Sequence, residues 1–297
     1  MDITQMDART LSLMMAGGCA MLAMHFTFKL VSEHLFYWKN PKEQKAILII
    51  VLMAPLYAID SFFGLVQITG SEALFTFLDA IKECYEALVI AKFLSLMYSY
   101  MGISMSNNVI PDEIKGRKIH NSFPMTLFLP HEVPLNQHTL KLLKSWTWQF
   151  VIIRPVLSIL MISLQLLGMY EGPITWIISL VLNSSVTLAM YSLIQFYHLF
   201  AKELASHKPL AKFLCIKGVV FFSFWQGIVM QILASAGMIQ KQKKLNVNQI
   251  EEAYQNLLVC LEMVAFAAIQ QYAFSAEEYA GEAQAKLKAA AAEKKDD

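Results

Sequence analysis

The chain has 297 residues, of which 56% are hydrophobic and only 16% are charged, and its mean hydropathy is +0.45. Soluble proteins carry roughly 25% charged residues, so this composition excludes an ordinary water-soluble domain and predicts a membrane protein. The net charge of +1, with no basic domain, gives no reason to expect nucleic acid as a partner.

Seven segments are long and apolar enough to cross a bilayer, which takes about 20 residues of helix. They lie at about residues 11–30, 44–66, 73–101, 143–167, 174–199, 213–236 and 253–274. We therefore predict an all-α polytopic protein with a seven-transmembrane helical bundle over residues 1–280. The first segment is interpreted as a signal anchor, because no convincing cleavage site follows it.

The orientation follows from the distribution of Lys and Arg, which are enriched in cytoplasmic loops. With seven spans, sixteen of the 24 fall on one side, in the C-terminal tail or in and directly beside the connections at 31–43, 102–142 and 200–212, and four fall on the opposite side. The other four (Lys82, Lys92, Arg154 and Lys217) lie within spans. We therefore expect the N-terminus outside and the C-terminus inside the cytoplasm.

Two cytoplasmic segments stand out beside the helices. The loop at 102–137 contains four prolines, so we expect it to be largely irregular, with the apolar stretch 123–129 at the bilayer interface or against the helices. The tail at 281–297 is rich in Ala, Lys and Glu and is expected to be solvated, with docking of a partner as the alternative.

The third predicted span carries a stripe of charged residues. Asp79, Lys82, Glu83 and Glu86 follow the i, i+3, i+4, i+7 spacing of one helix face. Because a charge costs at least about 2.5–3.5 kcal/mol at bilayer depth, these side chains should face the bundle interior. One interpretation is a self-neutralising network in which Lys82 pairs with Asp79 and Glu86. The other is a hydrated cavity that binds a cation or couples to protons.

Other polar residues fall within the remaining spans, and we expect them in the polar interior of the bundle or in a substrate site. Arg154 can neutralise an acid of the third span or bind the anionic group of an amphipathic ligand, and Lys217 can snorkel to the cytoplasmic surface. Asn183 starts a glycosylation sequon inside a span, where hydrogen bonding between helices is the better account. The further candidates are Asp60, Gln226 and Glu262.

The sequence lacks the motifs of several classes of enzyme and metal site. Nucleotide-binding, zinc-protease and serine-hydrolase motifs do not occur, so we expect no enzyme and no cofactor. The seven histidines form no i, i+3 or i, i+4 pair, which argues against a metal site. The four cysteines lie singly in apolar stretches and are interpreted as buried apolar residues.

A set of short strings, in order along the chain, resembles the organic solute transporter α / transmembrane protein 184 family, in particular its Lazarus-type branch. The strings occupy residues 33–44, 55–61, 84–90, 154–155, 183–191, 208–227, 260–263 and 272–274. The resemblance implies a seven-helix membrane protein with an outside N-terminus. Many relatives carry clustered cysteines before the fourth helix, whereas residues 123–129 here contain none.

For function, the resemblance implies a facilitative transporter or binder of amphipathic organic solutes, such as steroid-like molecules or organic anions, which works with a single-span partner. The alternative is a non-transporting receptor-like or scaffold protein of endomembranes, in traffic or cell-death signalling; a third is an accessory subunit of a larger complex. The expected partners are membrane lipids, a small single-span subunit or further copies of the chain. The expected location is the plasma membrane or an endomembrane of the vacuole or endosome.

Overall fold

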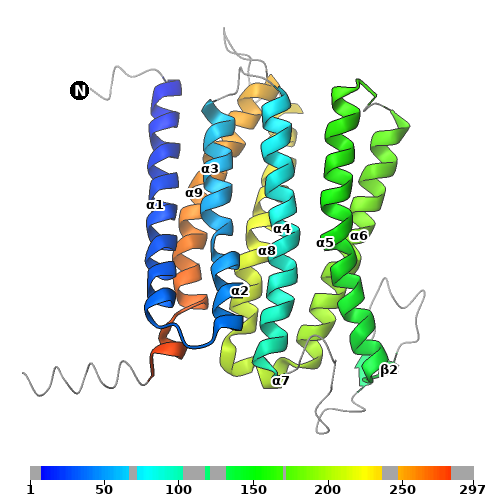
Figure 1. Ribbon diagram of the computed structural model, residues 1–297. Coiled ribbons are helices and arrows are strands. Elements are labelled where there is room, and N and C mark those ends of the chain that lie inside the picture. The colour runs from blue at the N-terminus through cyan, green and yellow to red at the C-terminus, as the bar shows by residue number, and fades with distance from the viewer. Residues whose placement is uncertain are drawn as a thin grey trace, which may run out of the picture. The chain divides into compact units, whose positions relative to one another are not determined.

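The computed structural model describes residues 8–66, 72–102, 118–120, 132–169, 172–235 and 247–281 (Figure 1). Helices dominate these residues, as the sequence predicts. The long helices are α1 (Ala8–Phe36), α2 (Pro41–Val51), α3 (Met53–Val66), α4 (Glu72–Tyr100), α5 (Gln137–Leu166), α6 (Pro173–Leu199), α8 (Pro209–Ser235) and α9 (Val247–Ala273). The short elements are β1 (Lys118–His120), β2 (Glu132–Pro134), α7 (Ala201–Leu204) and the 3-10 turn η3 (Ala205–His207).

The chain forms two compact units, one of Met1–Phe75 with Ala211–Asp297 and the other of Thr76–Leu210. In the first, which we call unit 1, α1 and α9 pack side by side and run in the same direction. Ala16 packs with Cys260 near one end, and His34 binds the carbonyl of Phe274 near the other. Buried residues recur every three or four positions along α1 and form a seam that faces the rest of the unit. They are Ala16, Ala20, Ala23, Thr27, Leu30 and His34. Small side chains over half of this seam allow close packing of membrane helices.

Two further helices of unit 1, α3 and α8, pack against α9. The Cys260 thiol lies 3.5 Å from the carbonyl oxygen of Ala58 in α3. Gly218 of α8 lies against Phe266, so close that a Cβ at Gly218 would come within 2.7 Å of the ring. A side chain at position 218 would therefore force the Phe266 ring to move.

The turn between α1 and α2 is held by one side chain, the fully buried Gln44. Its amide oxygen accepts hydrogen bonds from the backbone N–H groups of Lys39 and Asn40, at 2.8 and 2.9 Å. Its amide nitrogen donates to the carbonyls of His34 and Tyr37, at 3.1 and 2.9 Å. These groups lie between the last turn of α1 and the N-cap of α2, where helical hydrogen bonding stops. The Asn40 side chain makes no capping bond there, so Gln44 is the side chain that binds this part of the backbone.

The second predicted span is bent, because helix α2 ends at Val51 and α3 begins at Met53. Pro55 has no N–H to donate to the carbonyl four residues earlier, which belongs to Val51, and its ring crowds that carbonyl. The break at Leu52 is therefore the expected effect of Pro55. The two helices still form one apolar stretch, Pro41–Val66.

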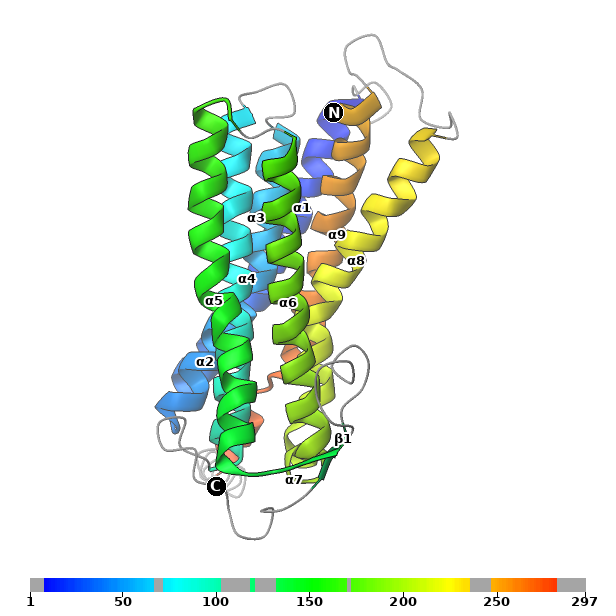
Figure 2. The same ribbon diagram turned by 90° about the vertical axis from the view of Figure 1, so that its right-hand side faces the viewer.

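Unit 2, the second compact unit, is built from α4, α5 and α6. Helix α5 contacts the other two, and its pairing with α6 is visible in Figure 2. Ala87 and Ile90 of α4 form a buried cluster with Phe150 of α5 and Ala189 of α6. Tyr98 of α4 stacks on the ring of Phe196 at a centroid distance of 4.9 Å.

Polar side chains join α5 to α6 inside this apolar surrounding. The hydroxyls of Thr147 and Ser192 share a hydrogen bond of 2.6 Å. The Gln149 amide donates to the carbonyl of Ser185 at 2.8 Å and accepts from the Ser185 hydroxyl at 2.7 Å. Interhelical bonds of this kind hold membrane helices in register.

Helix α5 starts where its sequence provides a cap. The side chain of Asn136 accepts a hydrogen bond from the N–H of Thr139 at 2.8 Å, the usual pattern for an N-cap asparagine. Just before it, β1 and β2 pair antiparallel, with Ile119 opposite Val133. The prediction of a largely irregular loop is thus wrong at these six residues, whereas the apolar stretch 123–129 and the tail 282–297 lie outside the described residues.

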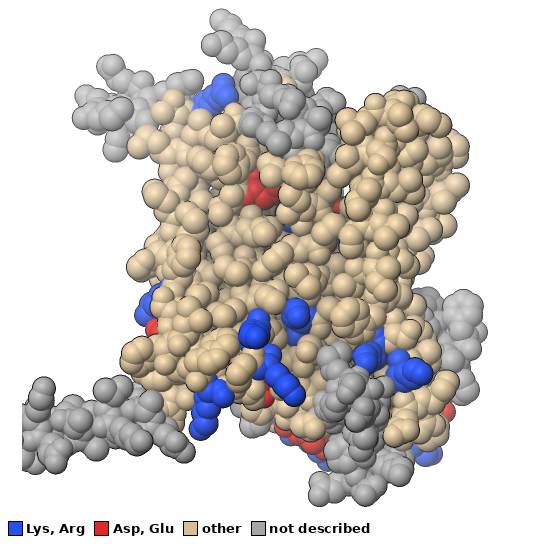
Figure 3. Space-filling view, in the orientation of Figure 1, with Lys and Arg blue, Asp and Glu red and all other residues tan. Residues whose placement is uncertain are grey.

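Five stretches of the described chain are long and apolar enough to cross a membrane: Arg9–Phe36, Pro41–Val66, Gln137–Leu166, Pro173–Leu199 and Gln249–Gly281. Large apolar side chains face outward on them, including Met21 at 64% and Trp176 at 79% exposure. In Figure 3 most of the visible Lys and Arg side chains lie in the lower half of the view, and the helix surface above them is nearly free of charge. Such surfaces need lipid around them, so the chain is an all-α, multi-pass membrane protein.

Candidate functional site

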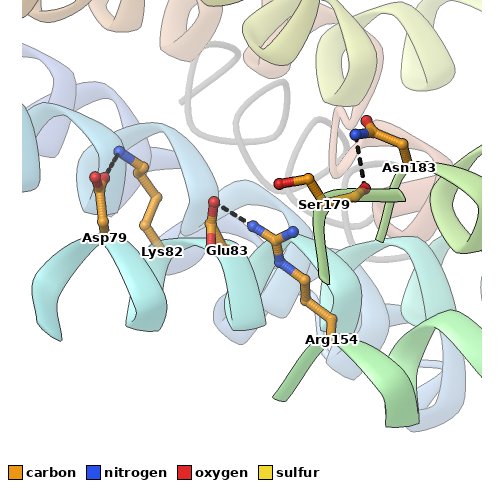
Figure 4. Close-up of polar contacts among 6 residues, drawn as sticks. All are labelled: Asp79, Lys82, Glu83, Arg154, Ser179 and Asn183. Atoms are coloured by element: carbon orange, nitrogen blue, oxygen red, sulfur yellow. Dashed lines mark hydrogen bonds and ion pairs between the residues drawn. The ribbon is translucent and has the colours of Figure 1, made fainter. Parts of the chain in front are cut away.

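The charged stripe of α4 lies against α5 in unit 2 (Figure 4). Lys82 forms an ion pair with Asp79, one turn earlier on the same helix. Arg154 reaches from α5 and forms an ion pair with Glu83. The side chain of Arg154 is only 16% exposed, and that of Glu83 is 37% exposed.

The Lys82–Asp79 pair corresponds to the self-neutralising interpretation, and the Arg154–Glu83 pair corresponds to the expectation that Arg154 neutralises an acid of the third span. Asp79 and Glu83 each have a cation, and both cations come from inside predicted spans. Glu86 lies one turn after Lys82 and is partly buried. Because Arg154 supplies the second cation, the stripe carries less net charge than α4 alone suggests.

Arg154 sits where the backbone of α5 is also weakened. Pro155 follows it inside the helix and has no N–H for the carbonyl of Val151. A polar group of a neighbour or ligand can satisfy such a carbonyl in a membrane. A guanidinium, a carboxylate and a freed carbonyl therefore lie within about one helical turn.

The prediction for Asn183 is wrong in its partner. Its side chain is exposed and donates to the carbonyl of Ser179 on the same helix, at 2.8 Å. The interhelical bond comes instead from Ser185, which faces Gln149 of α5. Positions 183 and 185 differ by about 200° around a helix, so only one of them can face α5.

The remaining candidates lie in unit 1, and two of them bind each other. The amide of Gln226 in α8 donates to the carboxylate of Glu262 in α9. Asp60 of α3 is 7% exposed, and Lys217 of α8 is partly buried. The sequence thus predicts that Gln226 and Glu262 are interior, and the structure adds that they bind each other.

Sequence patterns missed a third polar group, at the end of unit 1 where α1 and α9 finish. His34 is fully buried, and its Nε2 lies 2.8 Å from the carbonyl oxygen of Phe274. Lys212 was expected to be a loop charge, but it is only 2% exposed, with its ammonium 3.8 Å from Glu278 and above the Phe274 ring. The sequence did contain a signal for this group. Three of the strings that carry the family resemblance meet here, at residues 33–44, 208–227 and 272–274.

The chemistry of these groups is that of binding. Within the part of the chain that the structure describes, no three His, Cys, Asp or Glu side chains are placed to hold a metal ion. The groups that are present are ion pairs, amides and hydroxyls on transmembrane helices. They can recognise anionic or hydroxylated parts of a molecule that is otherwise apolar.

Comparison with known proteins gives the family. The family model described as organic solute transporter Ostalpha matches residues 12–279, from α1 to just beyond α9. The chain is 30% identical over 290 residues to protein LAZ1 homolog 1 of Arabidopsis thaliana, a match that covers 91% of this chain and 58% of that relative. The chain thus spans little more than half of the relative's length, and no solved structure matches it. The chain belongs to the organic solute transporter Ostalpha family, with a LAZ1-type protein among its relatives.

Proposed function

We propose that this protein is a facilitative transporter, or a binder, of amphipathic organic solutes such as steroid-like molecules and organic anions. Membership of the Ostalpha family carries the proposal. The Glu83–Arg154 pair on two membrane helices adds a group of suitable chemistry for a solute that is apolar with an anionic end.

The proposal includes a topology of seven spans with the N-terminus outside. Helices α4 and α8 are added to the five apolar stretches; they have 29 and 27 residues, and at 1.5 Å per residue each is about 40 Å long. Because α1 and α9 run in the same direction, the number of spans must be odd, as seven is. The excess of Lys and Arg on one side supports the orientation.

A transport assay tests the proposal directly. Purified protein is reconstituted into liposomes, with any small membrane protein that co-purifies, and the uptake of a labelled steroid sulfate is measured in both directions. Uptake that saturates and is driven only by the gradient supports the proposal. Absence of both binding and uptake contradicts it and favours a receptor-like or scaffold protein.

A set of charge variants separates solute binding from structure. Arg154→Gln leaves Glu83 without its cation on a span, a loss of about 2.5–3.5 kcal/mol, and should lower both thermal stability and uptake. The double variant Glu83→Gln with Arg154→Gln removes both charges and should recover stability. If Arg154 binds the anion of the solute, uptake stays low in the stable double variant.

The matched control is Lys141→Gln, which removes an exposed cation from the same helix. It should leave uptake and stability unchanged. If the double variant transports like the wild type, Arg154 has only a structural role, and the anion must be recognised elsewhere. Deletion of residues 282–297 tests the scaffold alternative. That alternative predicts that the deletion abolishes the effect of the protein in cells, whereas uptake of the solute stays the same.

A further inference from the structure

The chain beyond α9 folds against the end of unit 1. Residues 274–281, which we call the strap, follow the end of α9 and lie near the connection from α1 to α2 (Figure 1). Four of its side chains bury at least nine tenths of their surface: Phe274, Ala276, Tyr279 and Ala280. The Tyr279 hydroxyl donates to the Glu43 carboxylate of α2 at 2.9 Å, so the strap ties α9 to α2.

The seam between α1 and α9 becomes polar as it approaches the strap. Thr27 and His34 of α1 and Gln270 of α9 are 2%, 0% and 1% exposed. A hydrogen bond from the Gln271 amide to the carbonyl of Phe26 joins the helices at the level of Thr27 and Gln270. His34 lies two turns after Thr27, and Phe274 one turn after Gln270.

Four atoms of these three side chains have no hydrogen-bond partner among the described residues: Thr27 Oγ1, His34 Nδ1, and Gln270 Oε1 and Nε2. Buried polar atoms are nearly always satisfied by protein, water or a ligand. Three such side chains on one seam of two packed helices therefore indicate a binding site.

The chemistry of the atoms defines what they bind. A carbonyl oxygen only accepts hydrogen bonds, so the contact with Phe274 places the His34 proton on Nε2 and leaves Nδ1 as an acceptor. Gln270 offers both donors and an acceptor, and the Thr27 hydroxyl offers both as well. None of the three carries a charge in this state. A hydroxyl group can donate to His34 Nδ1 or to Gln270 Oε1 and can accept from the Gln270 N–H groups, whereas an anion can only accept.

We propose that Thr27, His34 and Gln270 form a hydrogen-bonding site for hydroxyl groups inside unit 1, with Thr27 and Gln270 at one level and His34 about two turns further along the seam, and that the strap controls access to it. The hydroxyl groups belong to water or to a lipid or solute that carries them. Opening the strap breaks the bond between Tyr279 and Glu43 and exposes the seam to the cytoplasmic side.

The test measures whether water reaches the seam. The four native cysteines (Cys19, Cys84, Cys215 and Cys260) are replaced by alanine, the full chain is placed in lipid nanodiscs, and Gln270→Cys is labelled with a membrane-impermeant methanethiosulfonate. The matched control is Met263→Cys, two turns earlier on the same seam of α9, where the native side chain is fully buried. Gel filtration and thermal stability show that each variant folds, and Thr27→Cys replaces Gln270→Cys if the latter does not.

We expect Gln270→Cys to react at least about tenfold faster than the control. Adding Tyr279→Phe, which removes only the hydroxyl bonded to Glu43, should raise the rate about fivefold further, the effect of one lost hydrogen bond on the opening equilibrium. A rate as slow as that of the control, or one that Tyr279→Phe leaves unchanged, overturns the proposal.

The occupant is identified by adding a sterol or its 3-ketone to the nanodiscs. Protection of the cysteine by the sterol alone supports the site and assigns it to a lipid hydroxyl. Fast labelling without protection supports the site and assigns it to water.

Discussion

Replacing Gln44 by leucine should destabilise the α1–α2 turn more than the loss of a single contact would. Leucine nearly fills the same volume but leaves the N–H groups of Lys39 and Asn40 and the carbonyls of His34 and Tyr37 without their partner. A buried polar group left unsatisfied costs about 1–3 kcal/mol. Because three of the four bonds are only partly buried and water can replace them in part, we expect a loss of about 3 kcal/mol.

Thermal unfolding in detergent, followed by tryptophan fluorescence and by gel filtration, measures this change. At about 2–4 °C per kcal/mol, the melting temperature should fall by roughly 6–12 °C.

Gln165→Leu is the matched control, since Gln165 is exposed near the end of α5. It should leave the melting temperature within about 2 °C of the wild type. If Gln44→Leu behaves like this control, the turn is stabilised by something other than the amide, and our account of it is refuted.

Two further packing predictions use the same assay. Gly218→Ala places a methyl group against Phe266 and should cost about 1–2 kcal/mol, whereas Gly18→Ala, with no atom within 4 Å, should be neutral or stabilising; equal effects would contradict the close approach. Thr147→Val should cost about 1 kcal/mol because it leaves the Ser192 hydroxyl without that partner, and adding Ser192→Ala should recover most of the loss. Additive losses in the double variant would show that the two hydroxyls do not depend on each other.

Much of the fold could be predicted from the sequence, because the apolar stretches are long. Where Gly or Pro marks the end of a span, the predicted end lies within a few residues of the observed end of the helix. Gly168 and Gly172, for example, take positive φ at the connection of α5 and α6. The bend at Leu52 follows from the missing N–H of Pro55. The start of α9 was predicted six residues late, at 253, because the polar turn Val247–Glu252 resembles a loop by composition.

The polar groups were predictable only where helical spacing determined them. The pairing of Lys82 with Asp79 is local to one helix, and a partner for Arg154 was expected on the third span. The choice between Asn183 and Ser185 depends on how α6 is rotated against α5, which neither length nor composition contains. Lys212 was predicted to be an exposed loop charge because it lies in a connection between spans. Nothing in its own segment shows that the strap covers it.

The common direction of α1 and α9 restricts how this chain can be rearranged. The first and last described residues lie at opposite ends of unit 1, so a linker between them would have to run along α1, whose 29 residues extend about 43 Å. Fully extended, such a linker needs at least about 13 residues. Within lipid its backbone would have no hydrogen-bond partners. Circular permutation, which many soluble domains tolerate, is therefore closed to unit 1, and in the proposed seven-span topology sensors attached at its two ends would report from opposite sides of the membrane.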